Sequence, residues 1–359
     1  MANHSSALMD LCECLRGRLP ARANWVSLIG LANETLTTPA LIDLVRQFER
    51  QIPDDACAYV RDIHQRNLTR NDRLAAQLEL TIVALNEGGV TPVLLKGAAT
   101  LAAAPRQTWG ARLMADLDLL VARDQADAAL AALSGAGYEL HFQTRPETER
   151  WYAELKRPHD IGMIDLHREA PGPRYFYHPS GPILQHCRRL SVGRGSAYIP
   201  APTYQAFMLI VHDQFQDYDY WVGNIDLRHL VELRDLTNSS EGIDWDKLAL
   251  FAHSKLARNA VESQLIALAE LLGVNVPLRM RSRLVPRLQF GRRLMQARFP
   301  ITRWPLLITT TLDYGNYRRG LGAQYRTQPR LLGPSWAMPK FGTLRYILGL
   351  ANNHRVGKV

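Results

Sequence analysis

Apolar side chains recur at helical spacing along the first 90 residues. The segment ALIDLVRQFERQI, residues 40–52, places its apolar positions three and four residues apart. A longer amphipathic stretch runs from Ala56 to Asn86 and meets a pair of glycines, which favour the end of a helix. The pattern therefore predicts an N-terminal helical region over residues 1–90.

The pattern changes after residue 90, where short apolar runs alternate with short helical stretches. The runs are too brief for helices and favour strands, most of them buried. The predicted strands are 93–95, 117–121, 138–142, 151–156 and 161–167, and the predicted helices between them are 98–104 and 125–133. The last two strands form a hairpin around Pro158. We therefore predict an α+β fold, in which a small mixed β-sheet core is flanked by N-terminal and C-terminal helical regions.

Helical spacing returns from Thr203 to Leu272, and Asp244 stands where it can cap a helix that opens at Trp245. The stretch after residue 275 mixes arginine, proline, glycine and aromatic residues with little periodicity. The predicted regions are an N-terminal helical region at 1–90, an α/β core at 91–200, a helical region at 201–275 and a basic C-terminal extension at 276–359.

The net charge of +9 is unevenly distributed along the 359 residues. Residues 271–359 hold 16 lysines or arginines and one acid, Asp313, so the rest of the chain is net acidic. Three interpretations compete. The extension 276–359 contacts an anionic membrane surface, it binds nucleic acid or another polyanion, or it packs on the acidic body of the protein.

The apolar runs and the cysteines indicate in which cellular compartment the protein is expected. No apolar run reaches the roughly 20 residues that span a bilayer, and the first residues do not resemble a signal peptide. The four cysteines, Cys12, Cys14, Cys57 and Cys187, match neither a common zinc spacing nor a disulfide framework. We expect reduced thiols in a cytoplasmic protein, with attachment to the membrane periphery as an alternative.

Two acids, Asp116 and Asp118, stand at the start of a predicted strand. Side chains two residues apart on a strand point to the same face. Carboxylates on one face repel each other unless a cation lies between them, and Mg²⁺ prefers such oxygen ligands. A solvated strand end would carry the same short motif, so the pair alone does not define a site.

A third acid, Asp165, lies within the otherwise apolar strand 161–167. Buried acids are rare without a partner or a metal. If this strand pairs near the strand of Asp116 and Asp118, the three carboxylates form one cluster. Such a cluster can hold two divalent cations, Mg²⁺ or Mn²⁺, and bind a triphosphate.

Lys96 and Gly97 follow a predicted strand and open a helix. Glycine lets an anion approach the backbone, the helix N-terminus offers free N–H groups, and Lys96 adds a positive charge. An ordinary strand-to-helix turn has the same appearance. Arg112, four residues before Asp116, is a candidate for binding phosphate or for pairing with an acid.

Three segments together, VLLKGAATL, RLMADLDLLV and IDLHRE, carry a family resemblance. The chain resembles the uncharacterised bacterial nucleotidyltransferase family of the DNA polymerase β-like superfamily. The resemblance implies transfer of a nucleoside monophosphate from a nucleoside triphosphate such as ATP to an acceptor, with release of pyrophosphate. It also implies that Mg²⁺ or Mn²⁺ is required, and it leaves the acceptor open between a small molecule, a sugar phosphate and a protein.

The resemblance also implies roles for individual residues. Asp116, Asp118 and Asp165 correspond to metal ligands and catalytic acids, and Lys96, Gly97 and Arg112 to the nucleotide-binding turn and its surroundings. Lys96 and Gly97 replace the Gly-Ser of the wider superfamily, which leaves the handling of the terminal phosphates open. The candidates for supporting positions around the ligands are His167, His212 and Asp226. Ordinary core, helix-surface or capping roles are the alternatives for these three.

Other classes of function remain open at this point. A tRNA-modifying or toxin-like nucleotidyltransferase would use the same carboxylates, and its basic extension would hold RNA. A non-catalytic nucleotide-binding scaffold could keep the fold without turnover. A glycosyltransferase with a D-x-D motif is also conceivable, but it commonly has a longer nucleotide-binding α/β half before that motif. The sequence makes no prediction about oligomeric state.

Overall fold

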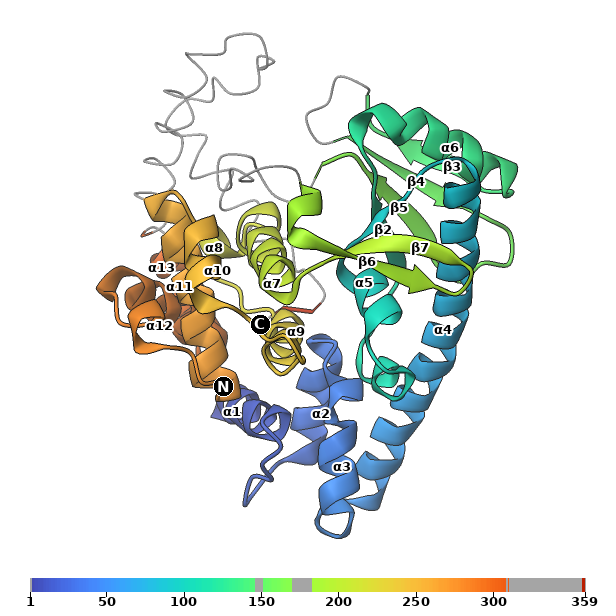
Figure 1. Cartoon of the computed structure of the whole chain (residues 1–359). Helices are drawn as coiled ribbons and strands as arrows, with labels where there is room; N and C mark the ends of the chain where they lie inside the picture. The colour runs from blue at the N-terminus through green and yellow to red at the C-terminus, as the bar shows by residue number, and fades with distance from the viewer. Residues whose placement is uncertain (1, 146–150, 170–182, 308, 310–356, 359) are drawn as a thin grey trace.

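A computed structural model describes residues 2–145, 151–169, 183–307, 309 and 357–358 of the chain (Figure 1). The described residues form a mixed sheet with helices before and after it along the sequence. The predicted α+β fold is therefore confirmed. The limits proposed for the four regions stay predictions.

The N-terminal region is helical, as its spacing predicts. Its α-helices are α1 (Ala2–Leu15), α2 (Trp25–Glu34), α3 (Ile42–Phe48) and α4 (Asp54–Glu87). The helix α4 covers the predicted amphipathic stretch and ends at Gly88. Figure 1 shows α4 running along one side of the molecule, from the small N-terminal helices at one end to the sheet at the other.

Seven strands of the described chain form one sheet, in the order β3-β4-β5-β2-β1-β7-β6. The strands are β1 (Val93–Leu94), β2 (Asp116–Leu120), β3 (Glu139–Gln143), β4 (Tyr152–Lys156), β5 (Met163–His167), β6 (Cys187–Val192) and β7 (Gly195–Pro200). The pairs β2–β5 and β1–β7 are parallel, and all other neighbours are antiparallel. The five predicted strands are present, and the predicted hairpin is β4–β5.

The strands β6 and β7 extend the sheet beyond the predicted core. They form a hairpin joined by Gly193 and Arg194, and Gly193 adopts a φ of +55°, a conformation that glycine tolerates without strain. The edge strand β6 carries two exposed arginines, Arg188 and Arg189, so its pattern lacks the apolar alternation of a half-buried strand.

The two faces of the sheet belong to different cores. Leu117, Leu119, Ile164 and Leu166 point to one face and are fully buried against α4, α5 (Lys96–Ala103) and α6 (Ala126–Gly135). The opposite face carries the acids of β2 and β5. At its edge, Val93, Leu95 and Leu120 join the second core, which the N-terminal and C-terminal helices build.

The C-terminal helices follow the sheet directly. They are α7 (Pro202–Val211), a π-helical turn (His212–Gln216), α8 (Asp219–Val222), α9 (Leu227–Thr237), α10 (Trp245–Phe251), α11 (Lys255–Leu272), α12 (Leu284–Arg298) and α13 (Arg303–Leu307). Asp244 accepts hydrogen bonds from the backbone N–H groups of Asp246 and Lys247, so its predicted capping role is confirmed.

Several arginines of the basic extension pair with acids of the helical region. The ion pairs Arg279–Asp246, Arg281–Glu270 and Arg283–Glu262 measure 2.7, 3.8 and 3.2 Å. These contacts agree with the interpretation that the extension packs on the acidic body. Most of residues 308–359 lie outside the described part of the chain, so contact with an anionic surface stays a prediction.

All four cysteines are free thiols. The cytoplasmic location stays a prediction. Within the described ranges, none of the helices combines the length and the apolar character that crossing a membrane requires.

Candidate active site

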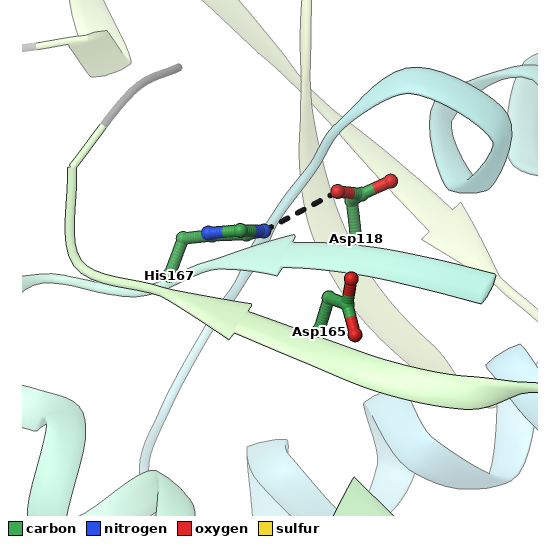
Figure 2. Close-up of side chains that lie close together, drawn as sticks. All are labelled: Asp118, Asp165 and His167. Carbon is green, nitrogen blue, oxygen red and sulfur yellow. Dashed lines mark hydrogen bonds and ion pairs between the residues drawn. The ribbon is translucent and has the colours of Figure 1, made fainter. Parts of the chain in front are cut away.

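The pairing of β2 with β5 brings the predicted acids together. The two strands are parallel, and Asp118 lies directly opposite Asp165 in the register. Asp116 lies two residues before Asp118 on the same face, and His167 lies two residues after Asp165. Figure 2 shows the side chains of Asp118, Asp165 and His167 converging above the two strands.

The register follows from the apolar residues between the acids. Leu117 and Leu119 on β2 and Ile164 and Leu166 on β5 are fully buried on the opposite face. A slip of one residue would turn the acids toward the apolar core and move these four apolar side chains to the opposite face. The sequence therefore fixes which face the carboxylates occupy.

Lys96 binds the innermost carboxylate. The backbone N–H of Leu95 donates to the carbonyl of Asp118, which sets Lys96 beside β2. The Lys96 ammonium then donates to Oδ1 of Asp118 at 2.7 Å, and Nε2 of His167 lies 3.2 Å from the same oxygen (Figure 2 shows the His167 contact). Asp118 is 2% exposed, whereas 34% of the Lys96 side chain is accessible. Part of the Lys96 side chain is therefore accessible to solvent.

The charges of the site are unevenly balanced. Burial opposes ionisation of Asp118, but Lys96 and His167 outweigh it and lower the pKa of this carboxyl group. Burial and then Asp118 raise the pKa of Asp116. Burial, Asp118 and Asp116 raise the pKa of Asp165 to about 6. Lys96 therefore neutralises Asp118, whereas Asp116 and Asp165 repel each other and Asp118.

The donor set suits a divalent cation. Asp118, Asp165 and His167 each offer a ligand atom, and these atoms lie within 4.8 Å of one another. Asp116 adds a carboxylate on the same face. Carboxylate oxygens are preferred ligands of Mg²⁺ and Mn²⁺, and a cation among them would relieve the repulsion that raises the pKa values of Asp116 and Asp165.

Gly97 and Arg112 contact protein groups in the structure. Gly97 is buried, and a Cβ atom at this position would lie 2.9 Å from the sulfur of Met114. Arg112 donates to Glu232 on α9 at 2.9 Å and also to the hydroxyl of Thr100. The structure thus shows the pairing of Arg112 with an acid, one of the two roles that its position suggests. The nucleotide-binding roles of Gly97 and Arg112 stay predictions.

His212 experiences the charges of the site, whereas Asp226 belongs to a separate buried group. Burial and Lys96 lower the pKa of His212 to about 3, so this imidazole is neutral at pH 7. Asp226 is 1% exposed and caps α9 by accepting from the backbone N–H of His229. Its neighbours are Asp213 and His229, and it does not join Asp118. For Asp226, the capping role is the one that the structure shows.

Three further residues of the site lack a motif in the sequence. Glu154 on β4 lies opposite Asp165 in the antiparallel register. The ring of Tyr152 stacks on His167 with 6.1 Å between centroids. Arg228 on α9 acts electrostatically on Asp116. The alternation of Tyr152, Glu154 and Lys156 could have placed the first two on one face, but Arg228 depends on the packing of α9.

The fold and the site define a class of protein. This is an α+β protein whose mixed sheet presents three carboxylates from two neighbouring parallel strands beside a lysine. A family model described as an uncharacterised nucleotidyltransferase matches residues 21–273, well over half of the chain. The chain therefore belongs to this uncharacterised nucleotidyltransferase family. No curated protein and no solved structure gives a significant match.

Proposed function

We propose that the protein is a divalent-cation-dependent enzyme that transfers a nucleoside monophosphate from a nucleoside triphosphate to an acceptor. The observation that carries the proposal is the parallel register of Asp118 and Asp165, with Asp116 on the same face and Lys96 in contact. Family membership supports the general activity. The choice of ATP among the triphosphates and the nature of the acceptor are further parts of the proposal.

The chemistry of the transfer agrees with these residues. An acceptor oxygen forms a bond to the α-phosphorus, the bond from that phosphorus to its bridging oxygen breaks, and pyrophosphate leaves with the electron pair. Asp116, Asp118 and Asp165 would hold Mg²⁺ or Mn²⁺, which supplies an electrophilic partner for the phosphate oxygens. The ammonium group of Lys96 carries the positive charge that could neutralise charge on the triphosphate.

The protein contributes positioning as well as charge. Asp118 is held in place by Lys96 and His167, so its carboxylate is oriented before any ligand arrives. His167 is in turn held against Tyr152. The proposed acceptor is a small molecule, a sugar phosphate or a protein side chain. The four free thiols agree with a proposed cytoplasmic location.

Substitution of the acids tests the proposal. Asp116→Asn and Asp118→Asn each keep the shape of the side chain but remove a negative charge that a cation requires. We expect each to reduce metal-dependent pyrophosphate release by at least about 100-fold, while the melting temperature shows a folded protein. The assay uses ATP, GTP, CTP and UTP with Mg²⁺ or Mn²⁺ and a metabolite extract as the source of acceptor.

The matched control is Asp127→Asn, which changes an exposed acid in the first turn of α6. It should release pyrophosphate at the wild-type rate. Wild-type turnover in Asp116→Asn and Asp118→Asn would exclude these carboxylates from the reaction.

A further inference from the structure

The ammonium group of Lys358, the penultimate residue of the chain, is buried among acids. It donates to Oδ2 of Asp217 at 2.9 Å and to Asp219, and it lies 3.8 Å from Asp213. Only 6% of the side chain is exposed. A lysine so close to the chain end is rarely buried unless its charge is fully paired.

Backbone contacts hold Lys358 and its neighbour Gly357 in place. The N–H of Gly357 donates to the carbonyl of Glu34 at the end of α2 at 2.8 Å. Lys358 also forms an isolated antiparallel bridge with Asp226, the capping residue of α9. The last described residues thus connect the N-terminal helices to the segment that precedes α9.

The acids that bind Lys358 come from an irregular stretch of backbone. The π-helical turn His212–Gln216 leads to Asp217, and Tyr218 then adopts a left-handed φ of +66°. This conformation is costly for a residue other than glycine, and it persists where surrounding contacts enforce it. It directs Asp217 and Asp219 to the same ammonium group. Lys358 thus contacts the residues on both sides of Tyr218.

One of these acids also contacts His212, a candidate supporting residue of the site. Oδ2 of Asp217, the oxygen that accepts from Lys358, lies 3.6 Å from Nδ1 of His212. His212 experiences the charges of Lys96 and Asp118. Contacts therefore lead from Lys358 through Asp217 to His212, and the charges of the site act on this imidazole.

The neighbouring charges show why Lys358 is required. Its ammonium faces four buried or half-buried acids, Asp213, Asp217, Asp219 and Asp226. The other cationic groups that face these acids are His229, Arg228, Arg293 and Arg303. Asp213, Asp226 and His229 have the spacing of a metal site, but Lys358 and these cations together supply positive charge to the group. Loss of Lys358 would leave a buried negative charge without its closest partner.

We infer that Lys358 is a positioning residue for His212, one of the candidate supporting residues of the site: through Asp217 it holds this imidazole in place. The expected effect on turnover rests on the proposed function, whereas the expected effect on the position of His212 does not. Sequence alone offers no sign of it, because Lys358 and Asp217 are 141 positions apart and share no motif.

The test compares Lys358→Met, which removes the charge, with Lys358→Arg, which keeps it. In Lys358→Met we expect faster amide hydrogen exchange across residues 212–222 and a shifted NMR signal of the His212 ring. We also expect kcat for pyrophosphate release to fall at least about tenfold while KM for the triphosphate stays within about twofold, because a displaced group costs rate more than binding. Lys358→Arg should restore most of the wild-type behaviour.

The matched control is Lys247→Met, an exposed lysine on α10, which should change none of these quantities. If Lys358→Met does not fold, Asp217→Asn breaks the shared contact at a partly exposed position and should give the same His212 and exchange changes. An unchanged His212 signal and unchanged exchange in the folded variant would overturn the inference. Wild-type protein without any metal-dependent turnover would instead count against the proposed function, and the exchange and NMR results would still decide the role of Lys358.

Discussion

At the scale of single residues, the site is defined by an excess of negative charge. Asp118 has Lys96 and His167 as partners, whereas among the described residues no cation lies as close to Asp116 or Asp165 on the same face. The raised pKa values of Asp116 and Asp165 express the cost of this arrangement. A site that is costly without a ligand and relieved by a cation is typical of a functional centre.

The raised pKa of Asp165 predicts that the stability of the metal-free protein depends on pH. Because the folded-state pKa of Asp165 is raised to about 6, its contribution to stability is fully present below the pKa of the unfolded chain and is lost as the pH rises through 6. Asp165→Asn should therefore stabilise the metal-free protein at pH 8 by about 1 kcal/mol, a value reduced for partial exposure, and should have little effect at pH 4.

Thermal unfolding in EDTA at the two pH values measures this difference. Mg²⁺ should raise the melting temperature of the wild type more at pH 8 than at pH 5, and should raise that of Asp165→Asn less. If Asp165→Asn were less stable than the wild type at pH 8, the inferred repulsion between Asp165 and the other two carboxylates would be contradicted.

The residue contacts show what sequence can predict. Alternation along a strand places Asp116 and Asp118 on one face without further information. Asp165 joins this pair only because β5 pairs with β2, and the paired residues Asp118 and Asp165 are 47 positions apart. Alternation within one strand does not predict that pairing. The partner of Arg112, Glu232, is 120 positions away. Long-range partners of charged side chains follow from tertiary packing and leave no local pattern.

At the scale of elements, α4 fixes the segment that leads into β2. Its buried Asn67 and Asn71 donate to carbonyls of the turn at 109–112 that leads toward the first acid. The spacing of apolar residues predicts the helix. It does not predict that two asparagines on the buried face satisfy the backbone of a neighbouring loop.

Asn71 gives a test of this contact. Its side-chain amide is fully buried and donates to the carbonyls of Trp109 and Arg112 at 2.8 Å each. Asn71→Ala leaves the carbonyl of Trp109 without this donor and should lower the free energy of unfolding by about 2 kcal/mol. The matched control is Gln65→Ala, an exposed residue on the same helix.

Urea unfolding of both variants gives the comparison. Equal midpoints for Asn71→Ala and the wild type would show that the asparagine does not hold the turn. A loss of the same size in Gln65→Ala would show that the effect is not specific to the buried amide of Asn71, because alanine has a higher helix propensity than glutamine or asparagine.

At the scale of the whole molecule, the sheet lies between two hydrophobic cores and presents its acids toward the second. The core below the sheet contains α4, α5 and α6, and the other contains the N-terminal and C-terminal helices. Periodicity predicted both helical regions. It could not predict that the end of the chain returns to them, because Gly357 and Lys358 are fixed by contacts with Glu34, Asp217 and Asp219.

The central claim is that Asp116, Asp118 and Asp165 together bind divalent cations with a nucleoside triphosphate. The most direct measurement is anomalous diffraction from crystals grown with Mn²⁺ and a non-hydrolysable triphosphate. The account predicts manganese peaks within coordinating distance of these carboxylates, about 2.0–2.3 Å for such oxygen ligands, and the triphosphate beside Lys96. Nucleotide bound elsewhere, with no manganese at the three acids, would contradict it.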